Sequence, residues 1–211
     1  MKIAVIGAAG KAGNLIVEEA VKRGHEVTAI VRKDKGAFNP AVKVLEEDLF
    51  ELKYEDIHEN EVVIDAFGTW EPDTLILHQT SLKYLADLLS GKENRLMVVG
   101  SAGSLYLDKE HTLRLVESPD MPEMFKPLAT NMCKAFDELK VRTDVRWTYV
   151  SPSVEFIPDG VRTGKYVLGS DELMVNNKGE SRISYADYAI AMLDEAESGK
   201  YIQKRFTVVS Q

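Results

Sequence analysis

The 211-residue sequence predicts an α/β fold, with a doubly wound parallel sheet and a small C-terminal cap. Three observations predict it. Short β-branched apolar runs alternate with longer amphipathic segments, which is typical of βαβ units. A glycine-rich turn lies between the first strand and the first helix. The alternation stops after Pro152, where the sequence becomes rich in glycine, proline, asparagine and charge.

The alternation can be followed from the N-terminus to Pro152. Predicted strands are short apolar runs, and predicted helices are longer segments with apolar residues three and four positions apart. Gly24 and Gly91 mark the ends of the first two helices, because glycine is favoured just after a helix. The predicted strands are 3–6, 27–31, 42–45, 62–67, 96–99 and 147–150, and the predicted helices are 12–23, 75–89 and 129–140.

Residues 153–183 form the predicted cap on the substrate side of the sheet. Short runs at 165–168 and 172–175 indicate small strands or a hairpin, and a helix over 185–197 and a strand over 206–209 follow. A cap of about thirty residues cannot support a substantial core of its own. We therefore expect a single domain over 1–211. The segment 103–127 has no clear pattern, and long irregular segments often carry function.

Charge and composition exclude several classes of function. The chain has 26 Lys and Arg against 34 Asp and Glu, a formal net charge of −8. An acidic chain repels nucleic-acid phosphates and anionic lipid, so we expect neither nucleic acid nor membrane as a partner. Cys133 is the single cysteine, which rules out an intrachain disulfide and suits a cytoplasmic protein. The histidines show no ligand spacing, so no metal is expected.

The glycine-rich turn predicts a dinucleotide site. It has the spacing GxxGxxG at Gly7, Gly10 and Gly13, between a strand and a helix. We expect Gly7 to permit the tight turn, Gly10 to let the backbone approach a pyrophosphate, and Gly13 to let helix and strand pack closely. A tight turn that binds nothing is the alternative, which this context disfavours. The same turn contributes the further expected contacts Ala9, Lys11 and Ala12.

The end of the second strand favours NADP(H) over NAD(H). An acid there would bind the ribose 2′-hydroxyl of NAD, whereas a base accommodates the 2′-phosphate of NADP. Arg32 stands at this position, and Lys33 follows it. An arginine fork suits a phosphate geometrically. Asp34 lies close enough to leave NAD(H) open, and a solvated basic turn is the alternative interpretation.

Taken together, the chain resembles a known family. It is similar to the atypical short-chain dehydrogenase/reductases, specifically the NADH-flavin reductases, and more distantly to the NmrA-like proteins and the biliverdin-IXβ/flavin reductases. The resemblance implies a Rossmann fold that binds a nicotinamide cofactor. It rests on the segments 7–13, 24–32, 48–49, 65–68 (Asp-Ala-Phe-Gly), 99–103, 158–164 and 183–189.

The resemblance implies further cofactor contacts after the predicted strands, where ligands of parallel sheets bind. Ordinary loop residues are the alternative at each position. The implied contacts are Asp48 and Leu49 beside the adenine, Ala66, Phe67 and Gly68 along the ribose and nicotinamide, and Pro152 and Ser153 at the nicotinamide.

The acid that typical short-chain dehydrogenases use is missing. Their Tyr-x-x-x-Lys corresponds to 130–134, where Lys134 fits but Thr130 replaces the tyrosine. A threonine hydroxyl is too weak an acid to exchange a proton with a substrate oxygen, which argues against the usual carbonyl–alcohol chemistry. Flavin reduction needs no strong protein acid, because the cofactor carries the hard chemistry. We therefore expect an NAD(P)H-dependent reductase of FMN, FAD, riboflavin or a similar flat acceptor.

The resemblance also implies candidate substrate residues. Ser101 matches the serine near the hydride path of the biliverdin/flavin reductases, and a turn-forming role is the alternative. Ser153 replaces a histidine of some relatives, which puts a tetrapyrrole substrate in doubt. Several aromatic residues could form a platform for the acceptor, and a place in a partly buried core is the alternative for each: Phe67, Trp70, Tyr106, Phe156 and Tyr166. Arg162 and Lys165 could bind a flavin phosphate, although solvated charges are the favoured interpretation.

Two other functions are alternatives to a flavin reductase. The first is a redox-sensing regulator that binds NADP(H) without turnover and controls a partner protein, which steady turnover would exclude. The second is a sugar-nucleotide epimerase, which the absent tyrosine and the short cap disfavour. We expect a monomer or a homodimer.

Overall fold

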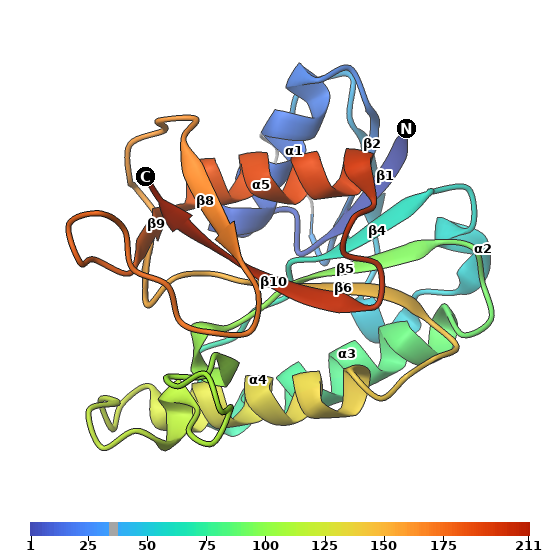
Figure 1. Ribbon diagram of the computed structural model, residues 1–211. Coiled ribbons are helices and arrows are strands. Elements are labelled where there is room, and N and C mark those ends of the chain that lie inside the picture. Colours follow the sequence, from blue (N-terminus) through green and yellow to red (C-terminus); the bar gives the residue numbers. More distant parts are fainter. Residues whose placement is uncertain (34–37) are drawn as a thin grey trace.

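The computed structural model describes residues 1–33 and 38–211, and it has a central sheet with helices on both faces (Figure 1). Asp34 lies outside the described residues. The strands are β1 (Lys2–Ile6), β2 (Glu26–Val31), β3 (Lys43–Glu46), β4 (Val62–Asp65), β5 (Arg95–Val99), β6 (Arg146–Ser151), β7 (Glu155–Ile157), β8 (Tyr166–Gly169), β9 (Arg182–Ser184) and β10 (Lys204–Ser210). The helices are α1 (Lys11–Lys22), α2 (Tyr54–Ile57), α3 (Leu77–Leu88), α4 (Lys126–Leu139) and α5 (Tyr185–Ser198), with 3₁₀ turns η1 (Leu49–Glu51), η2 (Pro72–Thr74), η3 (Ala102–Ser104) and η4 (Leu115–Glu117).

The main sheet has the strand order β3-β2-β1-β4-β5-β6-β10-β8. Its neighbouring strands are parallel except for β8, which runs antiparallel to β10 at one edge. The chain leaves β1 toward β2 on one side and returns to β4 on the other, so the strand order reverses at β1. Ligands of open α/β sheets bind at such a reversal.

The sheet separates two apolar cores. Helices α1 and α5 cover one face, and α3 and α4 cover the other (Figure 1). Successive strand residues point to opposite faces. In β1, Ile3 and Val5 accordingly belong to the first core, and Ala4 and Ile6 belong to the second. The predicted doubly wound parallel sheet is confirmed.

Several boundaries differ from the prediction, and two of the differences have an identifiable reason. The strand predicted over 62–67 ends at Asp65, because the Asp65 carboxylate accepts the N–H of Phe67 at 3.0 Å and turns the chain. The helix predicted from 129 begins at Lys126, with Pro127 in its first turn, where proline is tolerated. The segment 172–175 forms no strand, so that prediction is wrong; Glu172 makes an isolated bridge to Tyr106 instead.

The side chains at 171 and 172 bind other segments. Asp171 accepts from Arg205 at 2.8 Å, and Glu172 pairs with His111 at 2.7 Å. Arg114 also makes a two-pronged pair with Asp137 of α4, at 2.8 Å for each bond. These contacts tie the irregular segment 103–127 to the cap and to α4.

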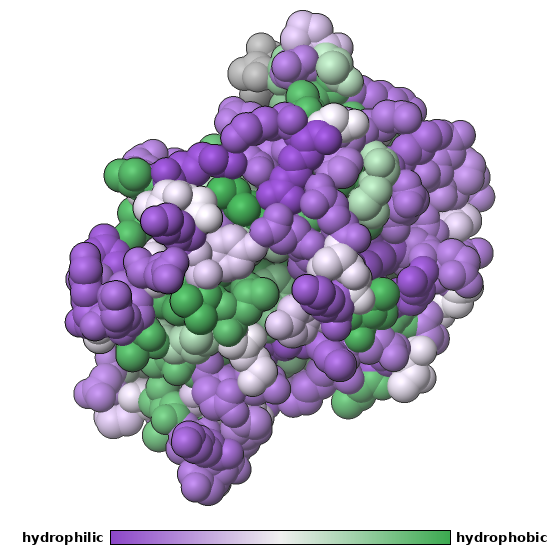
Figure 2. Space-filling view, turned by 45° about the horizontal axis from the view of Figure 1, so that its top comes forward, coloured by the Kyte–Doolittle hydropathy of each residue, from purple (hydrophilic) through white to green (hydrophobic). Residues whose placement is uncertain are grey.

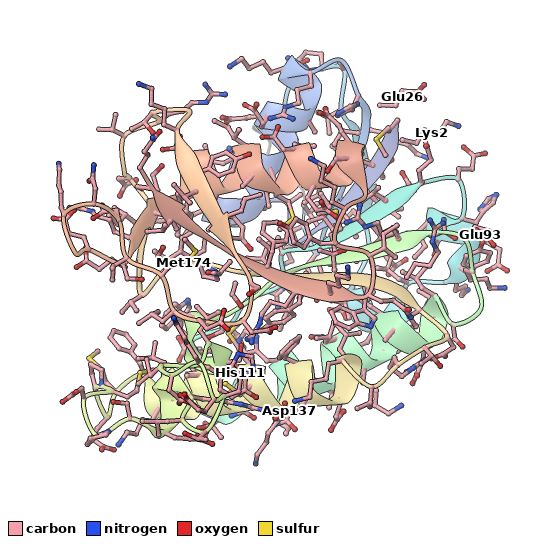
Figure 3. The ribbon with its side chains drawn as sticks, in the orientation of Figure 1. Lys2, Glu26, Glu93, His111, Asp137 and Met174 are labelled. Atoms are coloured by element: carbon pink, nitrogen blue, oxygen red, sulfur yellow. The ribbon has the colours of Figure 1, made fainter. Side chains whose placement is uncertain are left out.

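The strands run from one side of the molecule toward the cap. In Figure 3, Lys2 and Glu26 mark the starts of β1 and β2 at the right, and Met174 of the cap lies across at the left. Among the described residues, no helix is long and apolar enough to cross a membrane.

Candidate functional site

The glycine turn joins β1 to α1, and it packs so tightly that side chains do not fit. Gly7 has a φ of +71°, and an ideal Cβ there would lie 2.6 Å from the carbonyl oxygen of Ala66. An ideal Cβ on Gly13 would lie 2.3 Å from the carbonyl oxygen of Gly7. The close packing expected of Gly13 is therefore present, and the turn holds β1, α1 and the end of β4 together.

The start of α1 is arranged to receive an anion. Gly10 is the N-cap residue, so no side chain caps the helix, and its first turn contains no acidic residue. The first N–H groups of a helix have no intrahelical partner, and the helix dipole favours negative charge there. A pyrophosphate is the kind of group that such an uncapped helix start binds.

A groove with a volume of about 530 Å³ runs across the carboxyl ends of β2, β1 and β4. It lies at the reversal of the strand order, where a dinucleotide is expected. Most of the predicted cofactor contacts line it: Gly7, Ala9, Gly10, Arg32, Lys33, Asp48, Leu49, Ala66, Phe67 and Gly68. The lining residues that the sequence did not single out are Ile6, Ile30, Val31, Glu47, Phe50 and Leu77.

Basic and acidic side chains lie close together in the groove, after the paired strands β2 and β3. Arg32 and Lys33 are exposed directly after β2. Asp48 is exposed after β3, and its carboxylate accepts the N–H of Phe50 at 2.9 Å, which caps η1. Leu49 is buried beside it. The structure thus puts Arg32 and Lys33 in the lining of the groove, and their contact with a 2′-phosphate stays a prediction.

Five predicted contacts lie outside this groove. Lys11 borders a neighbouring hollow, Ala12 is half-buried, and Gly13 is buried in α1. Pro152 and Ser153 are both buried, and the Ser153 hydroxyl donates to the carbonyl of Val208 at 2.7 Å. Their place beside the nicotinamide stays a prediction.

Ser101 is held in a turn after β5. Its hydroxyl oxygen accepts the N–H of Gly103 at 3.0 Å, and its own N–H donates to the hydroxyl oxygen of Tyr149 at 3.1 Å. The turn-forming role is therefore present, and the hydroxyl is half-exposed with the rest of the residue. Its role near the hydride path stays a prediction.

Helix α4 does not present the lysine of typical short-chain dehydrogenases to the site. Thr130 and Lys134 are both exposed. Met132 lies beside the ends of β4 and β5 instead, and Cys133 is buried. Burial raises the pKa of the Cys133 thiol to about 12, so the thiol is neutral and unreactive.

A small hollow of about 20 Å³ adjoins the groove and shares Phe67 with it. It lies between α3 and α4 under the carboxyl ends of β4, β5 and β6, and its lining comprises Asp65, Phe67, His78, Ser81, Leu82, Val98, Val99, Met132, Ala135 and Tyr149. Burial raises the pKa of Asp65 to about 6, although the N–H of Phe67 acts in the opposite direction. In the sequence, Asp65 stands out only as part of the motif 65–68. A carboxylate at the end of an apolar strand is the signal that could have identified it as a site residue.

Two exposed aromatic residues lie in the connections that precede α3 and α4. Trp70 is 69% exposed, and its ring meets Phe125 edge-on at 6.4 Å between centroids. The other members of the predicted platform, apart from Phe67, are engaged elsewhere: Tyr106 stacks on His111, Phe156 packs on Tyr185 and Tyr188, and Tyr166 donates to Asp194. Figure 2 shows one face of the molecule. The larger hydrophobic areas on this face lie on its left, which is the side of the cap.

The two basic residues predicted to contact a flavin phosphate are Arg162 and Lys165. Arg162 pairs with Glu19 of α1 at 2.7 Å, so it ties the cap to that helix. Lys165 is exposed, as expected for a solvated charge. Within residues 1–33 and 38–211, no group of three or more His, Cys, Asp and Glu side chains is placed to hold a metal ion.

Comparisons with known proteins show which family the chain belongs to. The model of a family described as NAD(P)H-binding matches residues 7–196. The chain is 48% identical to the uncharacterized protein YwnB of Bacillus subtilis, over 100% of this chain and 99% of YwnB. It is 50% identical to SP1627 of Streptococcus pneumoniae, called "a putative NADH-flavin reductase", with a TM-score of 0.96 and full coverage of both chains. A Bacteroides thetaiotaomicron structure called a "putative epimerase" is 36% identical over 99% of this chain and 96% of its own, with a TM-score of 0.87.

Proposed function

The chain belongs to the NAD(P)H-binding family, and we propose that it is an NAD(P)H-dependent reductase that passes hydride to a flavin or a similar flat acceptor. The observation that carries the proposal is the groove over β2, β1 and β4 together with the uncapped start of α1. The turn around Gly7 has no room for side chains, which leaves the backbone free to approach a pyrophosphate. The residues present therefore fit a nicotinamide dinucleotide.

The roles of the residues follow from their places in the groove. The N–H groups at the start of α1 would hold the pyrophosphate, and Ala66 to Gly68 would border the path toward the nicotinamide. When bound, the reduced nicotinamide supplies the hydride. Arg32 and Lys33 would hold the 2′-phosphate of NADP(H), which makes NADP(H) the preferred cofactor and NAD(H) the weaker one.

A flat acceptor is favoured over a ketone or a sugar nucleotide. Carbonyl–alcohol chemistry and epimerisation of the short-chain dehydrogenase kind use a tyrosine that a nearby lysine acidifies. Here Thr130 stands at the tyrosine position, and both Thr130 and Lys134 are exposed. The similarity to SP1627 supports a flavin, whereas the missing tyrosine argues against the activity named for the Bacteroides relative.

The acceptor would stack at the mouth of the site on Trp70 and Phe125. Both lie at the carboxyl side of the sheet, in the segments that join β4 to α3 and β5 to α4. A large exposed aromatic ring offers a stacking surface for an isoalloxazine or another conjugated ring. Ser101, which follows β5, would lie on the same side as a hydrogen-bonding group.

Steady-state oxidation of the cofactor tests the proposal. The purified protein is mixed with NADPH or NADH and with FMN, FAD or riboflavin, and the loss of reduced nicotinamide is compared with a blank lacking protein. We expect saturable oxidation that depends on the protein and is faster with NADPH. Tight NADPH binding with no oxidation above the blank would reject the reductase and favour a redox-sensing regulator.

A further inference from the structure

The small hollow beside the cofactor groove contains a buried carboxyl group with no compensating cation. Asp65 is 5% exposed, and among the described residues its side chain accepts a single hydrogen bond, from the N–H of Phe67. Within the described part of the chain, no lysine or arginine lines the hollow, and Asp65 forms no ion pair. A buried carboxylate without a cation is costly, so such a group tends to keep its proton.

The other groups around the hollow are neutral, and they do not supply a charge for Asp65. His78 of α3 has its pKa lowered by burial, and its Nε2 lies 3.0 Å from the carbonyl oxygen of Thr69. Burial also raises the pKa of the Tyr149 hydroxyl of β6. Ser81 of α3 adds a hydroxyl to the lining. Asp65 is thus the acid of this cluster that can exchange a proton near neutral pH.

The size and place of the hollow connect Asp65 to the reaction. A volume of about 20 Å³ is enough for one water molecule, and Asp65, Ser81 and Tyr149 provide polar partners for it. Phe67 forms part of both the hollow and the cofactor groove. Met132 of α4 lines the hollow beside the carboxyl ends of β4 and β5.

We propose that Asp65 donates, through a water in this hollow, the proton that accompanies the hydride to the acceptor. This inference rests on the proposed reductase function. The O–H bond of Asp65 breaks, and its proton forms the new O–H or N–H bond of the acceptor, while the two electrons come from the reduced nicotinamide. The Asp65 carboxylate then takes a proton from solvent. This proton transfer matters most for acceptors that must be protonated after reduction, such as a para-quinone.

The variant Asp65→Asn separates this role from the structural one. The asparagine carbonyl oxygen can accept the N–H of Phe67 as the carboxylate does, so the turn after β4 is kept, but the amide cannot give up a proton near neutral pH. A group that only shapes the turn would be replaced by asparagine without a change in proton transfer.

The experiment compares two acceptors in single turnovers with NADPH, menadione as the para-quinone and FMN. Reduced FMN is stable as an anion near neutral pH, whereas the quinone must be protonated. With menadione, wild type should slow as the pH rises above about 6, and Asp65→Asn should be about 100-fold slower and lack this pH dependence. With FMN the two proteins should differ far less, and NADPH should bind both equally.

A second readout does not depend on turnover. The carboxyl carbons of ¹³C-labelled aspartate are titrated by NMR in wild type, and the Asp65 signal is the one absent from Asp65→Asn. We expect a midpoint near 6, well above an ordinary aspartate. A midpoint near the ordinary value, or an Asp65→Asn protein with the quinone rates and pH profile of wild type, would overturn the proton-donor role. If wild type reduced neither acceptor, the reductase function itself would fail.

Discussion

The carbonyl oxygen of Gly7 occupies the space that a side chain on Gly13 would need, since an ideal Cβ on Gly13 falls 2.3 Å from that oxygen. The neighbour is backbone at the tight turn between β1 and α1, so it cannot swing away as a flexible side chain would. This contact fixes the start of α1 over the end of β1. It is the same helix start that would hold the pyrophosphate.

Gly13→Ala should destabilise the protein and weaken cofactor binding. The methyl group would force α1 away from the turn, at a cost of about 1–3 kcal/mol, which outweighs the gain of about 1 kcal/mol from helix propensity. Urea unfolding and NADPH titration measure the two effects. Gly68→Ala is the control for stability, because an ideal Cβ there meets nothing within 4 Å. Unchanged stability and NADPH affinity in Gly13→Ala would refute the packing argument.

Arg32→Glu should weaken NADPH binding much more than NADH binding. The substitution places a carboxylate where the 2′-phosphate would bind, and the lost charge-assisted bonds are worth about 1.5–3 kcal/mol, or about 10-fold to 150-fold in affinity. Both dissociation constants are measured by nicotinamide fluorescence. Lys134→Glu makes the same change of charge at an exposed position on α4 and should alter neither constant. Equal losses for both cofactors in Arg32→Glu would exclude a 2′-phosphate role.

Trp70→Ala should raise the KM for FMN and leave NADPH binding unchanged. Removing a stacking ring costs about 1–3 kcal/mol, so KM should rise about 5-fold to 150-fold. The matched control is Val161→Ala, another strongly exposed apolar residue at 80%, in the cap. Steady-state kinetics with FMN as the varied substrate provide the measurement. An unchanged KM would remove Trp70 from the acceptor site.

Asp65→Asn should stabilise the protein above pH 6 and not below pH 4. The unfolded carboxyl loses its proton near its ordinary pKa of 3.8, whereas the folded one keeps it to about 6. The folded state therefore binds more protons in this window, and the stability of wild type falls as the pH rises through it. The variant avoids a loss of about 3 kcal/mol, since one pKa unit is worth about 1.4 kcal/mol.

Denaturant unfolding of both proteins across this pH range gives the comparison. The difference between their free energies of unfolding should grow from about pH 4 to about pH 6 and then level off. Parallel pH profiles would show that the Asp65 carboxylate is not penalised by burial.

Cys133 should resist iodoacetamide in the native protein and react with it in urea. The thiol is 4% exposed, and its raised pKa keeps it protonated, whereas the thiolate is the reactive form. Mass spectrometry after timed exposure reports the modification. Rapid alkylation of the folded protein at neutral pH would contradict the buried, unreactive state.

Much of the fold could be predicted from the sequence because local signals and the global topology agree. The alternation of apolar runs with amphipathic segments identified the strands from β1 to β6 and the long helices. The pairing of β7 with β9 was missed, since strands of three residues carry too little periodicity. The early end of β4 was also missed, because it depends on the bond from Phe67 to the Asp65 carboxylate.

The candidate site could also be predicted only in part. The glycine turn, Arg32 and the residues after β3 and β4 could be found because they follow strands of a recognisable unit. The hollow around Asp65 could not, since it joins β4 and β6 with α3 and α4 across distances that only folding closes. Likewise, the exposure of Lys134 depends on how α4 is rotated against the sheet.

The central claim is that NADPH bound in the groove over β1 gives its hydride directly to a flat acceptor. Anaerobic single turnover of NADPH with FMN on the protein tests it most directly. The absorbance of reduced nicotinamide and that of oxidised flavin should fall together, in one phase whose rate exceeds the blank without protein. NADPH that binds tightly while both absorbances stay constant would contradict the account.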